Sequence, residues 1–195
     1  MALARSNCSA SSNEAGFSLP EVMIALAILT FSLVALAQLF ATATRANLNA
    51  RTTTLSTALS QQKIEQLRAL TWGFDQLGLP VSDFASDTAV VPSQPDGGTG
   101  LSPSPANSLG QNTPGYVDYL DQFGNSLGGG ANPPRNTVYV RRWSVEPLPT
   151  NPNNTVIIQA LTFKAESARA GDDTDPSIRL PEESRMTTVK TRKSQ

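Results

Sequence analysis

Few residues of the chain could do chemistry, and Glu21 is the most unusual of them. It stands at the start of the longest apolar run, and no other charged residue occurs between Val22 and Thr44. An acidic side chain in the middle of a bilayer costs roughly 2.5–3.5 kcal/mol on insertion scales. A buried carboxylate is tolerated when it is paired with a cation. The position of Glu21 therefore predicts a compensating partner.

The chain lacks most of the residues on which catalytic and metal sites are built. Its 195 residues include no histidine and one cysteine, Cys8. A histidine-based catalytic triad and a zinc site made of cysteine and histidine are therefore excluded, and an internal disulfide needs two cysteines. A net charge of −1 gives no indication of a nucleic-acid partner. The composition predicts a protein that is not an enzyme and holds no cofactor.

Two charged segments near the C-terminus need an interpretation. Asp172, Asp173 and Asp175 form an acidic cluster between a glycine and a proline. Calcium takes oxygen ligands from such loops, but the spacing does not match an EF-hand, so we favour a solvated turn and keep calcium as the alternative. Residues 190–193, which include three cations, are interpreted as a solvated basic end.

The stretch 17–72 has the composition of one long helix. It contains no glycine, and its one proline, Pro20, falls in the first turn, where the missing N–H costs nothing. Good helix formers dominate the rest. Residues at about 22–44 are apolar nearly all round, and about 20 such residues cross a hydrocarbon core of roughly 30 Å. The first half of the helix is therefore predicted to span a membrane.

The second half of this helix is predicted to pack on a globular domain. Leucines recur there at spacings near 3.6 and form an amphipathic stripe: Leu48, Leu55, Leu59, Leu67 and Leu70. Lys63 and Gln66 interrupt the stripe. We favour packing over a free coiled coil because the heptads are not sustained.

The remainder of the chain is expected to hold a long connection and a small sheet. Residues 73–136 are rich in Gly, Pro and Ser and are predicted to form a variable connecting loop, with a short strand at 116–120 and a turn at 121–125. Within 137–195, strands are predicted at 137–146, 155–165 and 185–191, with a hairpin turn at 147–154. The expected fold class is α+β, with the long N-terminal helix packed on a small antiparallel β-sheet.

The start of the chain resembles the type IV pilin superfamily. A polar leader ends in Gly16, Phe17 follows, Glu21 is the fifth residue after the glycine, and an apolar helix of membrane length comes next. The resemblance implies that residues 1–16 are a prepilin leader, cut by prepilin peptidase between Gly16 and Phe17, and that Phe17 is then N-methylated. It also implies the type IV pilin-like fold.

The resemblance gives Glu21 a partner, because the pilin glutamate pairs between subunits with the N-terminal amine of a neighbour. Glu21 is then an assembly residue. The residues alone leave a second interpretation open, in which Glu21 complements the dipole at the helix start, an effect of about 0.3–1 kcal/mol.

The strands of the C-terminal part resemble those of PilV-like minor pilins, and the I-class pseudopilins of type II secretion share this layout. We therefore expect a minor pilin that is incorporated into a type IV pilus or primes it. The alternatives are a type II secretion pseudopilin and a single-pass membrane-anchored binding or adhesion module. The implied partners are prepilin peptidase, the major pilin and other minor pilins.

The resemblance also implies a location, which is the bacterial inner membrane, with the C-terminal domain outside the cytoplasm until the subunit enters a filament. The charge distribution does not support this orientation by itself. The leader has two positive charges, Arg5 and the amino terminus, and one negative charge, Glu14. Three cations, Arg45, Arg51 and Lys63, follow the apolar run, so the side predicted to lie outside the cytoplasm has more positive charges.

Overall fold

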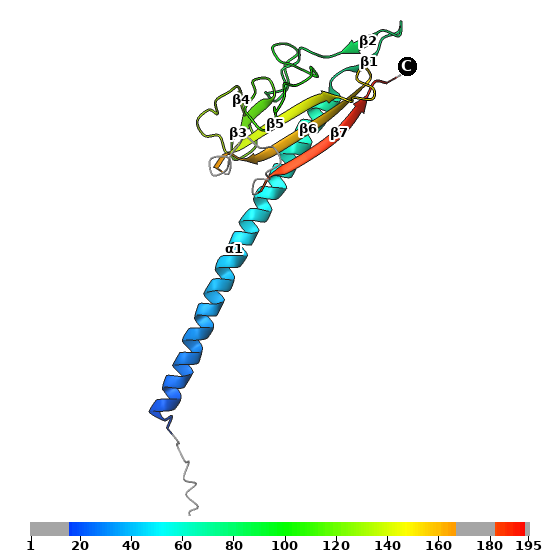
Figure 1. The fold of residues 1–195 in the computed structure, drawn as a ribbon. Helices are drawn as coiled ribbons and strands as arrows, with labels where there is room; N and C mark the ends of the chain where they lie inside the picture. The colour runs from blue at the N-terminus through cyan, green and yellow to red at the C-terminus, as the bar shows by residue number, and fades with distance from the viewer. Residues whose placement is uncertain (1–15, 167–181, 194–195) are drawn as a thin grey trace, which may run out of the picture. The chain divides into compact units, whose positions relative to one another are not determined.

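The computed structural model describes residues 16–166 and 182–193. The chain divides into two compact units, residues 1–47 and 48–195. One helix is followed by seven strands (Figure 1). In chain order the elements are α1 (Leu19–Ala69), β1 (Trp72–Phe74), β2 (Pro80–Ser82), β3 (Val117–Leu120), β4 (Ser126–Gly129), β5 (Tyr139–Pro147), β6 (Thr155–Lys164) and β7 (Ser184–Thr191).

The predicted long helix is confirmed as α1, which contains 51 residues. Ser18 stands at its N-cap position, because its carbonyl accepts hydrogen bonds from the amides of Glu21 (3.0 Å) and Val22 (3.2 Å). Pro20 lies in the first turn, as predicted. The residues from Leu48 onward belong to the second unit, and from Leu55 the helix packs on the sheet.

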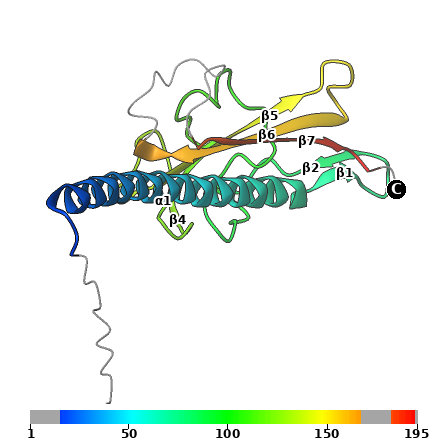
Figure 2. The same cartoon turned by 90° about the horizontal axis from the view of Figure 1, so that it is seen from below.

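The second unit is built on a five-stranded antiparallel sheet in the order β4-β3-β5-β6-β7. The predicted hairpin is present, since β5 and β6 pair from Tyr139↔Lys164 to Pro147↔Val156. A separate two-stranded sheet joins β1 and β2. Figures 1 and 2 show β5, β6 and β7 side by side along the last part of α1. The segment 73–136 supplies β2, β3 and β4, so it does more than connect the helix to the sheet.

Both faces of the central strands are covered. On one face Trp143, Val145 and Ile158 pack in a single cluster with Ile64 and Leu67 of α1. On the opposite face another cluster gathers Val117, Tyr119, Val140, Leu161 and Phe163 around Leu109, which comes from the segment before β3. Because both faces are covered, β5 is buried from Tyr139 to Val145 without the usual alternation.

The predicted leucine stripe packs as expected over most of its length. Leu59 and Leu67 are buried, and Leu55 and Leu70 pack against the core. Leu48 lies outside this contact and is 58% exposed. The interruption expected at Lys63 is wrong, because this lysine is fully buried on the same face of the helix.

Lys63 is tolerated there because it belongs to a buried ion cluster of Lys63, Asp118 and Arg141. Its Nζ lies 2.7 Å from Oδ2 of Asp118 and also donates to the carbonyl of Thr88. Arg141, opposite Asp118 in the β3–β5 register, donates to both carboxylate oxygens at 2.9 and 2.8 Å. One carboxylate of the sheet therefore binds a cation of the helix and a cation of the neighbouring strand.

The end of α1 is held by a residue that sequence reasoning assigned to a solvated tail. Lys190 lies in β7, and its Nζ donates to the carbonyls of Arg68 (2.7 Å) and Leu70 at the end of the helix. Unpaired carbonyls at a helix C-terminus favour a cation. Arg192 is also bound, since its Nε donates to the Asn153 carbonyl at 2.8 Å. The expected solvated basic end at 190–193 is therefore wrong for these two residues.

The burial of Lys63 and the partial burial of Lys190 predict that the folded chain becomes more stable as the pH rises from about 8 to 10. Burial lowers the pKa of Lys63 from 10.5 to about 8, although Asp118 acts to raise it. Burial likewise lowers the pKa of Lys190 from 10.5 to about 8. The unfolded chain therefore binds more protons in this range, and its formation becomes less favourable as the pH rises. Lys63 alone contributes at most about 1.4 kcal/mol per pH unit.

Above pH 10 the trend should reverse, since burial raises the pKa of Tyr116 and Tyr119 above 10. Guanidinium unfolding of the full chain in detergent micelles, at fixed salt and at pH 7, 8, 9 and 10, measures the slope. Lys63→Met should reduce the slope of stability against pH between pH 8 and 10. A stability that stays constant or falls between pH 8 and 10 contradicts this assignment of the lysines.

Candidate assembly site at the start of the helix

Gly16, Phe17 and Glu21 lie at or just before the start of α1. Gly16 and Phe17 precede the first helical residue, and the Phe17 side chain is 81% exposed. A Cβ added at Gly16 would meet no atom within 4 Å. Glu21 is exposed in the first turn of the helix, where a carboxylate complements the helix dipole. Among the residues that the structure describes, Glu21 forms no ion pair.

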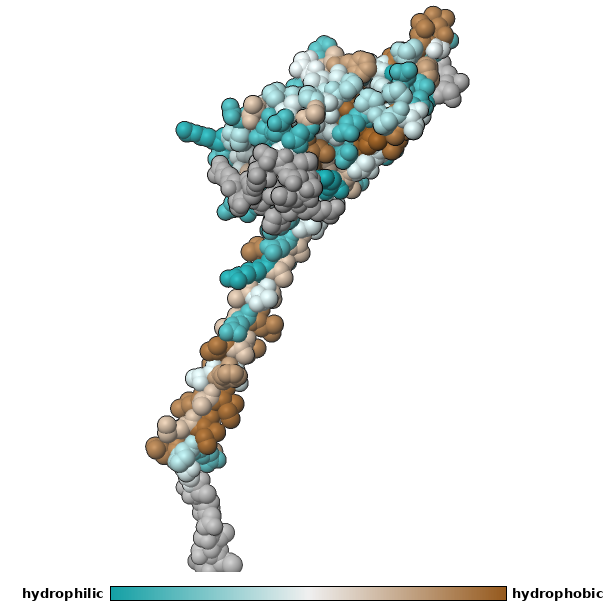
Figure 3. Space-filling view, in the orientation of Figure 1, coloured by the Kyte–Doolittle hydropathy of each residue, from teal (hydrophilic) through white to brown (hydrophobic). Residues whose placement is uncertain are grey.

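The apolar run after Glu21 has no cover within the chain. The helix contains an 18-residue window of mean hydropathy 2.4, and none of that window is buried. Figure 3 shows hydrophobic side chains along the first part of α1. The large exposed ones include Met23, Ile24, Leu26, Ile28, Leu29, Phe31, Leu33, Val34, Leu36, Leu39 and Phe40. By length and composition this helix can cross a membrane, and an apolar surface of this extent marks contact with lipid or other proteins.

Three hydroxyl groups within the apolar run, those of Thr30, Ser32 and Thr42, are satisfied by the helix itself. Oγ1 of Thr30 donates to the Leu26 carbonyl (2.9 Å), and Oγ of Ser32 donates to the Ile28 carbonyl (2.8 Å). Thr42 bonds in the same way to the carbonyl of Gln38 (3.0 Å). A hydroxyl that is bonded four residues back adds no unpaired donor to the lipid phase. The residues four positions before each hydroxyl can be located in the sequence, but the hydrogen bonds become visible only once the helix is formed.

Among the residues that the structure describes, Glu21 at the start of the run and Gln38 and Thr44 within it remain without such a bond. Among the described residues, neither the Glu21 carboxylate nor the Gln38 amide makes a hydrogen bond within the helix. A polar group in lipid favours a partner on a neighbouring helix. The first unit therefore presents a long apolar surface that carries one carboxylate and one amide for such partners.

Comparison with known proteins agrees with this geometry. Residues 11–37 match the family model described as the prokaryotic N-terminal methylation motif. The chain carries the type IV pilin and pseudopilin signal. The matched range includes Gly16, Phe17 and Glu21 and much of the apolar run. The search of curated proteins and the search of solved structures gave no match.

The chain that carries this signal has the predicted fold class. One long N-terminal helix packs on antiparallel sheets, which is an α+β arrangement of the type IV pilin-like kind. The motif indicates a structural subunit of pilin or pseudopilin type that is anchored in a membrane.

The individual roles expected of the site residues remain predictions. These are cleavage between Gly16 and Phe17, methylation of Phe17 and the pairing of Glu21. The calcium alternative, at Asp172, Asp173 and Asp175, falls outside the described residues. Within the described part of the chain, no group of three or more His, Cys, Asp or Glu side chains could hold a metal ion.

Proposed function

We propose that this chain is a minor pilin subunit of a type IV pilus system. It is held in the bacterial inner membrane by a single span at about 22–44, with the unit 48–195 outside the cytoplasm. Prepilin peptidase removes residues 1–16, and the mature subunit joins the major pilin and other minor pilins in a filament or primes its assembly. One observation carries the proposal: the methylation motif lies on a helix whose apolar surface is uncovered.

The chemistry of assembly follows from two opposite charges near the start of the mature chain, of which cleavage creates one. Cleavage after Gly16 frees the α-amine of Phe17, which is cationic at neutral pH at its ordinary pKa of about 7.7–8.0. Glu21 lies only four residues further on, at the start of the span. In a bundle of such helices, the carboxylate of one subunit meets the amine of the next, and both charges are compensated away from water. The free subunit lacks this pairing, which favours entry into the filament.

Helix packing supplies the remaining contacts. The exposed apolar side chains of α1 exchange lipid for neighbouring helices, and the Gln38 amide forms an interhelical hydrogen bond. Model peptides give such bonds about 1–2 kcal/mol. The pairing of Glu21 sets the axial register, and the packing of the span holds it.

A type II secretion pseudopilin is the second candidate, because the methylation motif is the signal of both classes. Co-purification of the mature chain from membranes separates them: pilus components should accompany a minor pilin, and secretion components a pseudopilin. A chain that purifies in mature form without any pilin-like neighbour supports the anchored binding module instead.

Processing gives the most direct test of the proposal. Intact-mass spectrometry of the protein from membranes should show a chain that begins at Phe17 and carries one additional methyl group. The same gene expressed without prepilin peptidase serves as the control and should retain Met1. A chain that keeps Met1 in the presence of the peptidase contradicts both pilin-type functions.

A further inference from the structure

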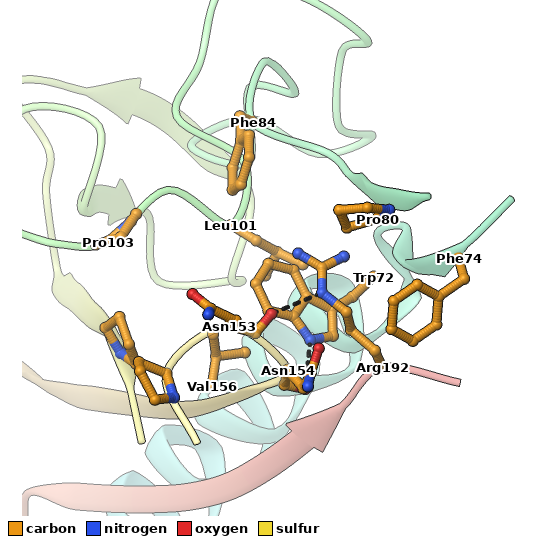
Figure 4. Close-up of a pocket in the computed structure, with 12 residues that line it drawn as sticks. Trp72, Phe74, Pro80, Phe84, Leu101, Pro103, Asn153, Asn154, Val156 and Arg192 are labelled. Carbon is orange, nitrogen blue, oxygen red and sulfur yellow. Dashed lines mark hydrogen bonds between the residues drawn. The ribbon is translucent and has the colours of Figure 1, made fainter. Parts of the chain in front are cut away.

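The second unit contains a cleft bordered by β1, β2, the segment 84–103, the turn between β5 and β6, and Arg192 just after β7. Its volume is about 550 Å³, and it is lined mainly by aromatic and proline side chains (Figure 4). Trp72, Phe84 and Leu101 provide apolar walls, and Pro103 adds to them. This size and this mixture of apolar walls with a few polar groups are typical of a ligand site.

The cleft is preformed. Trp72 contacts Phe84 edge to face at a centroid distance of 6.4 Å, and its Nε1 donates to the Asn154 carbonyl at 3.2 Å. The Arg192 guanidinium lies 3.9 Å from the centre of the Trp72 ring. It is fixed there because its Nε donates to the carbonyl of Asn153 and its Nη1 to two further carbonyls. A site whose walls are already ordered loses little conformational entropy when a ligand binds.

The donors on the cleft lining that have no partner among the described residues include groups of Arg192 and Asn153. Nη2 of Arg192 donates to no acceptor there, whereas Nε and Nη1 of the same guanidinium do. The side-chain amide of Asn153 is also without a bond, since only the backbone carbonyl of this residue is used. The cleft therefore offers donors to an occupant that has acceptors, set among apolar walls.

A second hollow of about 430 Å³ adjoins the cleft and shares Trp72 and Phe74 with it. Its lining includes three cations, Arg68, Lys190 and Lys193. Lys190 is engaged by the end of α1. Arg68 and Lys193 are exposed, and neither forms an ion pair within the described part of the chain. This basic hollow therefore suits a negatively charged group.

We propose that the cleft and the basic hollow together bind an extended, proline-containing acidic peptide segment of a partner protein. Its apolar and prolyl side chains pack in the cleft against the exposed ring of Phe84 and against Pro103, and its carboxylates lie beside Arg68 and Lys193. An extended polyproline II segment has no internal hydrogen bonds, so its carbonyls accept from Arg192 and Asn153. Aromatic-lined grooves bind such segments in several recognition domains. This proposal does not depend on the proposed pilus function. It adds a binding partner to that function.

Other occupants fit the same features less well. A sugar stacks on open aromatic faces, but Trp72 is only 8% exposed and carries Arg192 over its ring, which leaves Phe84, 50% exposed, as the open ring of this pair. A second copy joined at this end would bring like charges together, because both copies carry the same cations. A lipid surface does not fill a concave cleft. The exposed Leu77 and Leu79 of the β1–β2 turn, 84% and 58% exposed, extend the apolar surface beside it.

The test uses the full chain in detergent micelles and an immobilised array of ten-residue peptides that scans the positions of Leu, Pro and Glu. Peptides containing both Pro and Glu should be retained. The strongest is then labelled and titrated by fluorescence anisotropy, together with the same peptide in which Gln replaces every Glu. The Gln peptide should bind about tenfold more weakly, and added salt should weaken only the acidic peptide.

Matched variants locate the binding. Arg68→Gln with Lys193→Gln should weaken the acidic peptide about tenfold, and Phe84→Ser should weaken both peptides. Arg51→Gln with Arg135→Gln removes two exposed cations elsewhere and should leave binding unchanged. The proposal is overturned if no peptide of the array binds, or if the acidic and Gln peptides bind alike. It is also overturned if the Arg68 and Lys193 substitutions weaken binding of phosphatidylglycerol vesicles or of an oligosaccharide but leave peptide binding unchanged.

Discussion

Glu21→Ala is expected to reduce incorporation of the subunit into filaments by at least about tenfold, while processing and membrane insertion continue. Removing one partner of a buried ion pair costs about 3–5 kcal/mol, because the other charge is left uncompensated. In the proposed filament that charge is the Phe17 amine of a neighbouring subunit. The amount of mature chain in sheared filaments, divided by the amount in membranes, measures the effect.

Two further variants separate the ion pair from other roles of this carboxylate. Glu21→Gln keeps the size and the polarity, so it should behave like Glu21→Ala if charge is what matters. Glu65→Ala removes an exposed acid from the same helix outside the apolar run and should leave incorporation normal. If Glu21→Gln assembles normally, the carboxylate acts only as a polar residue at the helix start.

The helix and its signal could be predicted from the sequence because their determinants are local. Fifty-six residues without glycine, with one proline in the first turn, specify a helix by composition alone. Gly16, Phe17 and Glu21 form a motif at fixed spacing, and the family match falls on the same residues. The strands at 155–165 and 185–191 were also predictable, since their β-branched residues follow turn signals.

The buried ion cluster could not be predicted, because it depends on pairing between distant segments. A lysine within a leucine stripe indicates an exposed position unless its counter-ion is known. That counter-ion, Asp118, meets Arg141 only through the β3–β5 register. It meets Lys63 only when the helix packs on this face of the sheet. The local sequence of 73–136 predicts the strand at 116–120, which is confirmed as β3, but it does not specify that β3 pairs with β5 or that β2 and β4 also form.

Asp118→Asn is expected to destabilise the folded second unit by about 3–5 kcal/mol, the second large effect predicted for this chain. The substitution keeps the shape of the side chain but leaves Lys63 and Arg141 as two buried cations without an anion. Trp143 reports the loss directly, since it is fully buried and Nζ of Lys63 lies 4.0 Å from its ring centre. Guanidinium unfolding of the full chain in micelles, followed by tryptophan fluorescence, gives the free energy.

Replacing all three charged residues of the ion cluster should lower the free energy of unfolding less than replacing Asp118 alone. The triple variant Lys63→Met, Asp118→Leu, Arg141→Met replaces three desolvated charges by apolar groups of similar length, an exchange that is often neutral or stabilising in other proteins. The carbonyls of Thr88 and Leu59 lose their donors, so some destabilisation should persist. We expect the triple variant to unfold at a higher guanidinium concentration than Asp118→Asn. If it unfolds at a lower one, the three charges stabilise the helix–sheet contact by their mutual attraction, and the desolvation cost is the smaller effect.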